Sequence, residues 1–145
     1  MGRLGRDEAL ARLILDTTVL VDAERNGLGT LGEVIGDEDD VAIAAITVAE
    51  LVVGAELADG KRRARRETFL AATLETFSVE GYDLEVARAH GALLAHARRA
   101  GRPRGAHDLI IAATARARNR EVVSADAAGF AELPEVVLRD AGGGR

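Results

Sequence analysis

Short apolar runs alternate with longer segments of helical periodicity along almost the whole chain, and this alternation limits the possible folds more than any other feature. Five runs have the length and the polar boundaries of buried strands: 13–16, 41–45, 77–79, 121–124 and 136–138. Helical segments separate them: 19–25, 28–35, one from 47, 61–76, 83–99, one from 107 or 108 to 119, and a short helix or turn at 127–131. Strands that alternate with helices form parallel sheets covered on both faces. The sequence therefore predicts an α/β fold around a mainly parallel sheet.

The chain has the length of a single domain. At 145 residues it can bury a sizeable core, and it contains no internal repeat, low-complexity segment or linker. We expect one domain over residues 13–140. The segments 1–12 and 141–145 are expected to be flexible or peripheral termini, with a short extra helix as an alternative near the start.

Polar residues stand where the predicted helices begin and fit helix caps. Thr17 and Thr18 can cap the first helix, and Asp83 can cap the long helix that follows it. Thr47, followed three residues later by Glu50, fits a capping box, which occurs at many helix starts with no chemistry attached. Capping and metal binding are not exclusive, because α/β sites are built where strands pass into helices. Both interpretations of Glu50 therefore stay open.

Four acidic residues stand where apolar segments pass into polar ones: Asp16, Glu50, Asp108 and Asp126. Asp16 and Asp126 fall at the ends of predicted strands, which is where parallel sheets bind their ligands. Glu50 and Asp108 lie in or just before predicted helices. Carboxylates beside core segments are costly to desolvate, and converging ones repel each other unless a cation lies between them. A converging cluster predicts a Mg²⁺ or Mn²⁺ site of the kind that handles phosphates.

Composition excludes several classes of function. The chain contains no Cys, which rules out disulfides, thiolate metal sites and cysteine nucleophiles. Hydrophobic residues make up 48% of the chain but aromatic residues only 3%, which predicts an aliphatic core and no platform for stacking bases. The charged start lacks the apolar region of a signal peptide, and no apolar stretch approaches the ~20 residues of a membrane span. We expect a soluble, cytoplasmic protein that does not associate with membranes.

Charge is distributed unevenly along the chain. The net charge of −5 argues at first sight against a nucleic-acid ligand. Acids concentrate at 37–40 and in the suspected site, whereas bases cluster at 61–66 and 98–104. A basic rim around an acidic, metal-filled centre is compatible with a phosphodiester substrate. A solvated helix face is the better interpretation for 61–66, and for 98–104 both interpretations stay open.

Four motifs carry a resemblance to a known family. They are Leu15-Asp16-Thr17-Thr18-Val19-Leu20, Ile46-Thr47-Val48-Ala49-Glu50-Leu51 with Gly54, Gly101-Arg102-Pro103 through Asp108-Leu109-Ile110-Ile111-Ala112-Ala113-Thr114-Ala115, and Val122-Val123-Ser124-Ala125-Asp126 with Phe130. Each motif is common by itself, but their order and spacing are specific in combination. Over residues 13–138 the chain resembles the PIN-domain ribonucleases, and closely the VapC toxins of bacterial toxin–antitoxin pairs. The resemblance implies a PIN-like three-layer α/β/α fold with a central, mainly parallel sheet of four to five strands.

The resemblance also implies an activity. The four acids would hold one or two Mg²⁺ or Mn²⁺ ions, and a metal-activated water would hydrolyse an RNA phosphodiester bond. Thr17 and Ser124 would orient a carboxylate or a water behind the metal ligands. A VapB-like antitoxin would lay a helix over an apolar groove and place an Arg in the acidic site, and the toxin would form a homodimer. Residues 51–53 and Leu57 are candidates for lining that groove or, equally, for ordinary core packing.

The sequence departs from the family's pattern in two respects. Ala125 precedes the fourth acid and Ala127-Ala128 follow it, where the family often has a basic or polar residue and a further acid. The metal would therefore depend more on the other three carboxylates. Arg104 stands where a small or apolar residue is common, and it predicts an added phosphate contact. Arg102 and His107 are the other predicted substrate contacts, and His107 is alternatively a helix cap.

Other functions fit less well. A ribonuclease driven by imidazoles needs two facing histidines, but His90 and His96 lie six positions apart on one predicted helix. A phosphotransfer receiver domain needs a lysine at a late strand end, and the single lysine is Lys61. A dehalogenase-like phosphatase needs an Asp where Thr18 stands. The alternative that stays open is a catalytically degenerate PIN domain that serves only as an RNA- or protein-binding module.

Overall fold

The computed structural model describes residues 11–141, so the expectations for 1–10 and 142–145 lie outside the described residues. The strands are β1 (Arg12–Leu15), β2 (Asp40–Ala44), β3 (Ser78–Glu80), β4 (Glu121–Ser124) and β5 (Leu138–Asp140). The helices are α2 (Thr17–Asn26), η1 (Leu28–Glu33), α3 (Ala45–Glu56), α4 (Gly60–Thr76), α5 (Leu84–Ala100), α6 (Ala106–Arg118) and η2 (Ala127–Gly129), of which η1 and η2 are 3₁₀ helices. Among them, none is long and apolar enough to cross a membrane.

All five strands belong to one parallel sheet in the order β3-β2-β1-β4-β5. From β1 the chain builds outward through β2 and β3, and it then crosses over to build β4 and β5 on the other side of β1. The strand order therefore reverses between β1 and β4, which pair in the centre of the sheet. Ligands of open α/β sheets bind at such a switch point, beyond the carboxyl ends of the strands.

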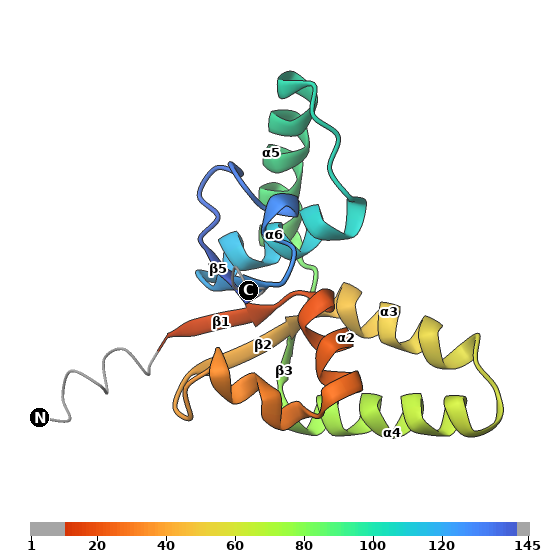
Figure 1. The fold of residues 1–145 in the computed structure, drawn as a ribbon. Coiled ribbons are helices and arrows are strands. Elements are labelled where there is room, and N and C mark those ends of the chain that lie inside the picture. Colours follow the sequence, from red (N-terminus) through yellow and green to blue (C-terminus); the bar gives the residue numbers. More distant parts are fainter. Residues whose placement is uncertain (1–10, 142–145) are drawn as a thin grey trace, which may run out of the picture.

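Each face of the sheet packs against its own group of helices. Figure 1 shows α5 and α6 on one side of the sheet and α2, α3 and α4 on the other. Side chains alternate along β1, so Leu13 and Leu15 enter the core beneath α2, whereas Ile14 enters the core beneath α6. All three are fully buried. The predicted α/β fold is confirmed, with a sheet that is parallel throughout and has helices on both faces.

Two helix starts differ from the sequence prediction. Asp16, rather than Thr17 or Thr18, caps α2, because its side chain accepts a hydrogen bond from the backbone N–H of Thr17 at 2.7 Å. Helix α3 begins at Ala45, directly after β2, so Thr47 lies inside the helix and the predicted capping box is wrong. The physical reason is that Ala45, a strong helix former, continues from the strand without a loop. Asp83 caps α5 as predicted and accepts from the N–H of Val86 at 3.1 Å.

The last strand also lies later than predicted. The apolar run 136–138 suggested a strand, but β5 pairs through Leu138–Asp140, and Val137 is 61% exposed. Arg139 explains the shift, because its guanidinium donates to the Val34 carbonyl at 2.9 Å and lies 3.1 Å from Glu121. An edge strand held by these polar contacts has no apolar signature.

A buried arginine connects four of the strands. Arg120, just before β4, is 8% exposed, and its Nη1 donates to the carbonyls of Leu13 at 3.2 Å and Asp40 at 3.0 Å. The same nitrogen lies 3.1 Å from the Asp40 carboxylate, and Nε donates to Glu80 at 2.8 Å. Removing a buried charge leaves its partners uncompensated, which costs more stability than the intact pair contributes.

We therefore expect Arg120→Ala to lower the free energy of unfolding by about 3 kcal/mol. Arg12→Ala is the matched control, because Arg12 contacts the same Asp40 at 2.8 Å but is 44% exposed in its side chain. It should cost less than about 1 kcal/mol. Urea unfolding of both variants measures the two values, and equal losses would contradict the role given to burial.

Candidate active site

Asp16 is fixed at the carboxyl end of β1 by three hydrogen bonds. The residue is 2% exposed. Its Oδ1 accepts from the N–H of Thr17, and its Oδ2 accepts from the hydroxyls of Thr18 at 2.8 Å and Ser124 at 2.7 Å. Both carboxylate oxygens thus have donors, which compensates the burial of the charge. The contact of Thr18 was not predicted, although the hydroxyl run after Asp16 in the sequence was a signal for it.

The hydroxyls that hold Asp16 also hold the segment that carries Asp126. The Ser124 hydroxyl accepts from the N–H of Asp126 at 2.9 Å, and the Thr18 hydroxyl accepts from the N–H of Ala125 at 3.2 Å. The hydroxyl of Thr18 in the first turn of α2 and that of Ser124 at the end of β4 therefore bridge the two acidic segments across the switch point. This pairing places Asp126 beside Asp16, as its predicted position at a strand end required.

Glu50 reaches the same site from α3. Its Oε1 accepts from the Thr17 hydroxyl at 2.6 Å, and its Oε2 lies 2.7 Å from Nδ1 of His107. His107 belongs to the first turn of α6, and the N-cap of that helix is Gly105, so the interpretation of His107 as a cap is wrong. Instead, the imidazole and the Thr17 hydroxyl hold one Glu50 oxygen each.

Asp108 interacts electrostatically with the other three acids. Its pKa is raised to about 6, chiefly by burial and then by the charges of Asp16, Asp126 and Glu50 in that order, whereas the charge of His107 lowers it. Carboxylates influence one another in this way only when they lie close together in a poorly hydrated place. The four residues predicted from four separate segments therefore share one site.

Two glycines give the Asp108 carboxylate its space. A Cβ on Gly129 would lie 2.9 Å from Asp108 Oδ2 and 3.5 Å from Asp126 Oδ2. A Cβ on Gly105 would lie 3.2 Å from the same Asp108 oxygen. A side chain at Gly129 would therefore displace the carboxylate or the loop. Neither glycine was predicted as part of the site, because the sequence does not show which loops approach Asp108.

The donor set fits a hard divalent cation. All four acidic groups offer oxygen, the ligand that Mg²⁺ and Mn²⁺ prefer. In their present positions, no three His, Asp or Glu side chains within residues 11–141 form a ready coordination group. Mg²⁺ keeps several of its waters, so one or two direct carboxylate ligands are sufficient. Burial, and after it the charges of Asp16, Asp126 and Glu50, raise the pKa of Asp108, and a bound cation would offset both effects.

The three predicted substrate contacts already have protein partners. Arg102 is 2.9 Å from the carboxylate of Glu132, in an ion pair that is largely exposed. Arg104 donates to backbone carbonyls of the loop that follows Asp126. Together with the contact between His107 and Glu50, these interactions leave the substrate roles of Arg102, Arg104 and His107 as predictions.

The fold and the site together define an α/β domain with an acidic centre at the switch point of its parallel sheet. The family model for the PIN domain matches residues 13–136, and the chain belongs to the PIN-domain family. This membership agrees with the four motifs, each of which contributes one of the carboxylates.

Relatives of known name and structure match nearly the whole chain. A protein named ribonuclease VapC from Rickettsia bellii (strain RML369-C) is 26% identical over 125 residues, which cover 86% of this chain and 92% of the relative. The structure of VapBC-5 from Mycobacterium tuberculosis, a member of the VapBC family of toxin–antitoxin systems, is 29% identical with a TM-score of 0.74, covering 90% of this chain and 99% of that one. DNA-bound VapBC from Salmonella typhimurium is 25% identical with a TM-score of 0.78, covering 90% and 98%.

The raised pKa of Asp108 predicts how stability depends on pH in the metal-free protein. A carboxyl whose pKa is higher in the folded state binds its proton more tightly there, so stability falls as the pH rises from about 4 to about 6. Asp108→Asn should remove this loss of folding stability, because the amide does not titrate. The difference in pKa corresponds to roughly 3 kcal/mol, and we expect a gain of about 1 to 2 kcal/mol at pH 7 because solvent screens the partly exposed group.

Urea unfolding of the metal-free wild type and Asp108→Asn at pH 4 and pH 7 measures this gain. The two proteins should be nearly equal at pH 4, where the carboxyl is protonated. Asp37→Asn is the control, because it removes the same charge from an exposed position. A gain from Asp37→Asn as large as that from Asp108→Asn would show that net charge, and not the site, is responsible.

Proposed function

We propose that this protein is a Mg²⁺- or Mn²⁺-dependent endoribonuclease that acts as the toxin of a toxin–antitoxin pair. The observation that carries the proposal is the convergence of Asp16, Glu50, Asp108 and Asp126. Ser124 links Asp16 to Asp126, Gly129 lies against the carboxylates of both Asp108 and Asp126, and Glu50 accepts from Thr17, the residue after Asp16. Membership of the PIN-domain family and similarity to a protein named ribonuclease VapC support it. The alternative of a degenerate binding module is less favoured, because all four acids are present at one site.

The residues of the site would have separate roles in this activity. A bound divalent ion supplies Lewis-acid chemistry, which activates water and neutralises charge on phosphate oxygens. Asp16 is held by the hydroxyls of Thr18 and Ser124, so it would present its charge in one orientation. Thr17 and His107 would orient Glu50 in the same way. Arg102, in a largely exposed ion pair with Glu132, would exchange that partner for an RNA phosphate.

Asp16→Asn tests the proposed activity. The amide keeps the shape of the side chain but removes its charge, so Mg²⁺-dependent cleavage of RNA should fall by at least about 100-fold, or about 2.7 kcal/mol in transition-state stabilisation. Cleavage of a mixed transfer-RNA substrate with Mg²⁺, and again with EDTA, gives the rates. Asp37→Asn should keep wild-type activity. A wild type that binds RNA but never cleaves it in Mg²⁺ or Mn²⁺ would favour the degenerate binding module.

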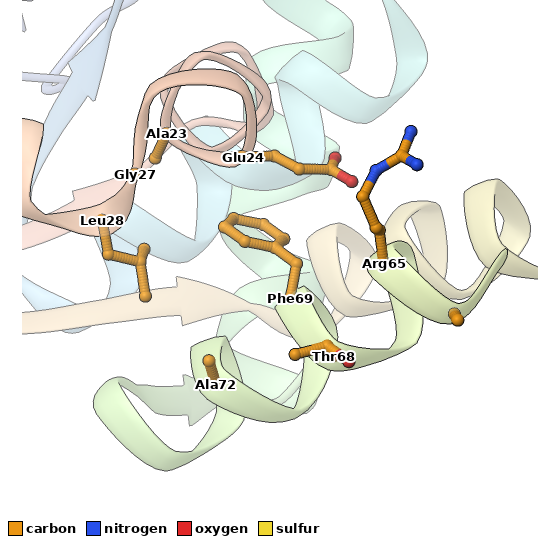
Figure 2. Close-up of a pocket in the computed structure, with 9 residues that line it drawn as sticks. Ala23, Glu24, Gly27, Leu28, Arg65, Thr68, Phe69 and Ala72 are labelled. Carbon is orange, nitrogen blue, oxygen red and sulfur yellow. The ribbon is translucent and has the colours of Figure 1, made fainter. Parts of the chain in front are cut away.

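The proposed partner is a VapB-like antitoxin, because complexes of VapB and VapC are among the similar solved structures. An apolar groove of about 510 Å³ lies between α2 and α4, where Phe69 and Leu28 face each other across the opening (Figure 2). Glu24 and Arg65 lie at its rim. A groove of this kind accepts the apolar face of a helix. A homodimer, also implied by the resemblance, stays a prediction.

The groove continues toward the acidic site. Glu24 and Phe69 also line a second hollow, which extends to Thr17 and Glu50. Of the residues predicted to line a groove or to pack in the core, Leu51 packs against the core, whereas Val52, Val53 and Leu57 are 38%, 53% and 84% exposed. Their exposure supports a surface role for these three. An antitoxin helix in the groove could therefore extend an Arg to the carboxylates, as the resemblance implies.

Substituting these exposed residues tests the partner surface without disturbing the core. We expect the double variant Val53→Asp, Leu57→Asp to weaken capture of a VapB-like antitoxin by at least about tenfold, because it would place charges at a desolvated contact. Co-expression followed by affinity purification and titration measures the change. Val137→Asp, at a residue 61% exposed near β5, is the control. Unchanged affinity in the double variant would remove the end of α3 from the partner surface.

A further inference from the structure

Arg104 connects the two segments that carry Asp108 and Asp126. It stands immediately before Gly105, the N-cap of the helix that carries Asp108. Its Nη2 donates to the carbonyl of Ala131 at 2.8 Å. Its Nη1 lies 3.3 Å from the carbonyl of Gly129 and 3.4 Å from that of Ala128, so it is shared between them. One guanidinium thus bonds three backbone carbonyls of the loop 127–131.

We propose that Arg104 is a positioning residue that clamps the loop 127–131 to the start of α6 and thereby sets the separation of the Asp108 and Asp126 carboxylates. The inference rests on the proposed function, because that separation matters only if the carboxylates bind a cation. Arg104 itself touches none of the four acids in the contacts described above.

The loop is where such a clamp acts directly on the site. Gly129 lies against the Asp108 carboxylate so closely that an added Cβ would be 2.9 Å from Oδ2. The Arg104 contact to the Gly129 carbonyl holds the backbone of that same residue. Beyond it, Phe130 is 2% exposed and anchors the loop in the core. The clamp and the anchor together keep the loop against Asp108.

The shape of the guanidinium, and not only its charge, suits it to this role. Its planar fork presents several N–H groups in fixed directions, whereas a lysine ammonium is a compact charge on a flexible stem. Lysine at this position would keep a phosphate contact but could not bond both ends of the loop. Arg104→Lys therefore separates the clamp from the phosphate contact predicted from the sequence.

The experiment compares the full-length wild type, Arg104→Lys and Arg104→Met. Hydrogen exchange of the metal-free proteins reports on the amides of Gly129 and Phe130, which donate within the loop to Asp126 and Ala127. Calorimetric titration with MgCl₂ reports the affinity of the site. We expect both variants to exchange faster at these two amides and to bind Mg²⁺ about tenfold more weakly. Arg88→Lys, at an exposed position on α5, is the control and should match the wild type.

Gly129→Ala tests the position of the loop relative to Asp108 without changing Arg104. Its Cβ would displace either the Asp108 carboxylate or the loop while the Arg104 side chain remains, so Mg²⁺ should again bind more weakly. Wild-type exchange and Mg²⁺ affinity in Arg104→Lys would overturn the proposal. So would a raised KM for RNA in Arg104→Met alone, because that result identifies a phosphate contact. If the wild type bound no Mg²⁺, the proposed function would fail, and the exchange rates would still decide whether the clamp exists.

Discussion

Repulsion among carboxylates at the switch point of the sheet is the constraint on which the rest of the structure depends. The parallel pairing of β1 with β4 brings Asp16 and Asp126 to one edge. Helices α3 and α6 then add Glu50 and Asp108 from opposite faces of the sheet. Folding therefore works against both the burial and the mutual repulsion of these carboxylates, and the raised pKa of Asp108 reflects burial first and repulsion second. The aliphatic cores on both faces supply the burial that offsets it.

The four acids are not held alike. Both oxygens of Asp16 and of Glu50 accept hydrogen bonds from neighbouring side chains or backbone. Within residues 11–141, the carboxylates of Asp108 and Asp126 accept no such hydrogen bond. Their close neighbour is Gly129, whose backbone lies against both of them. The site thus combines two fixed acids with two whose positions depend on the loop and helix that carry them. A cation would act mainly on this second pair, and this is why control of the loop 127–131 matters.

Much of this arrangement could be predicted from sequence, and the contacts that were missed around Asp108 and Asp126 have a common cause. Strand positions and the acids at strand ends follow from local apolar patterns, so Asp16 and Asp126 were found without coordinates. The role of Arg104 could not be found in this way, because its partners are carbonyls of residues 128–131, more than twenty positions away. The crowding at Gly129 was hidden for the same reason. Backbone contacts between distant segments have no signature in residue type.

The wrong capping box at Thr47 bears directly on the function of Glu50. A capping-box glutamate turns back to the backbone N–H at the start of its helix, which would explain Glu50 without any chemistry. Because α3 begins at Ala45, Thr47 is a buried residue inside the helix and Glu50 lies in the second turn. Its carboxylate instead meets Thr17 from α2 and His107 from α6. Helix capping therefore does not explain Glu50. Its carboxylate is a charged group that residues of three helices hold at the site.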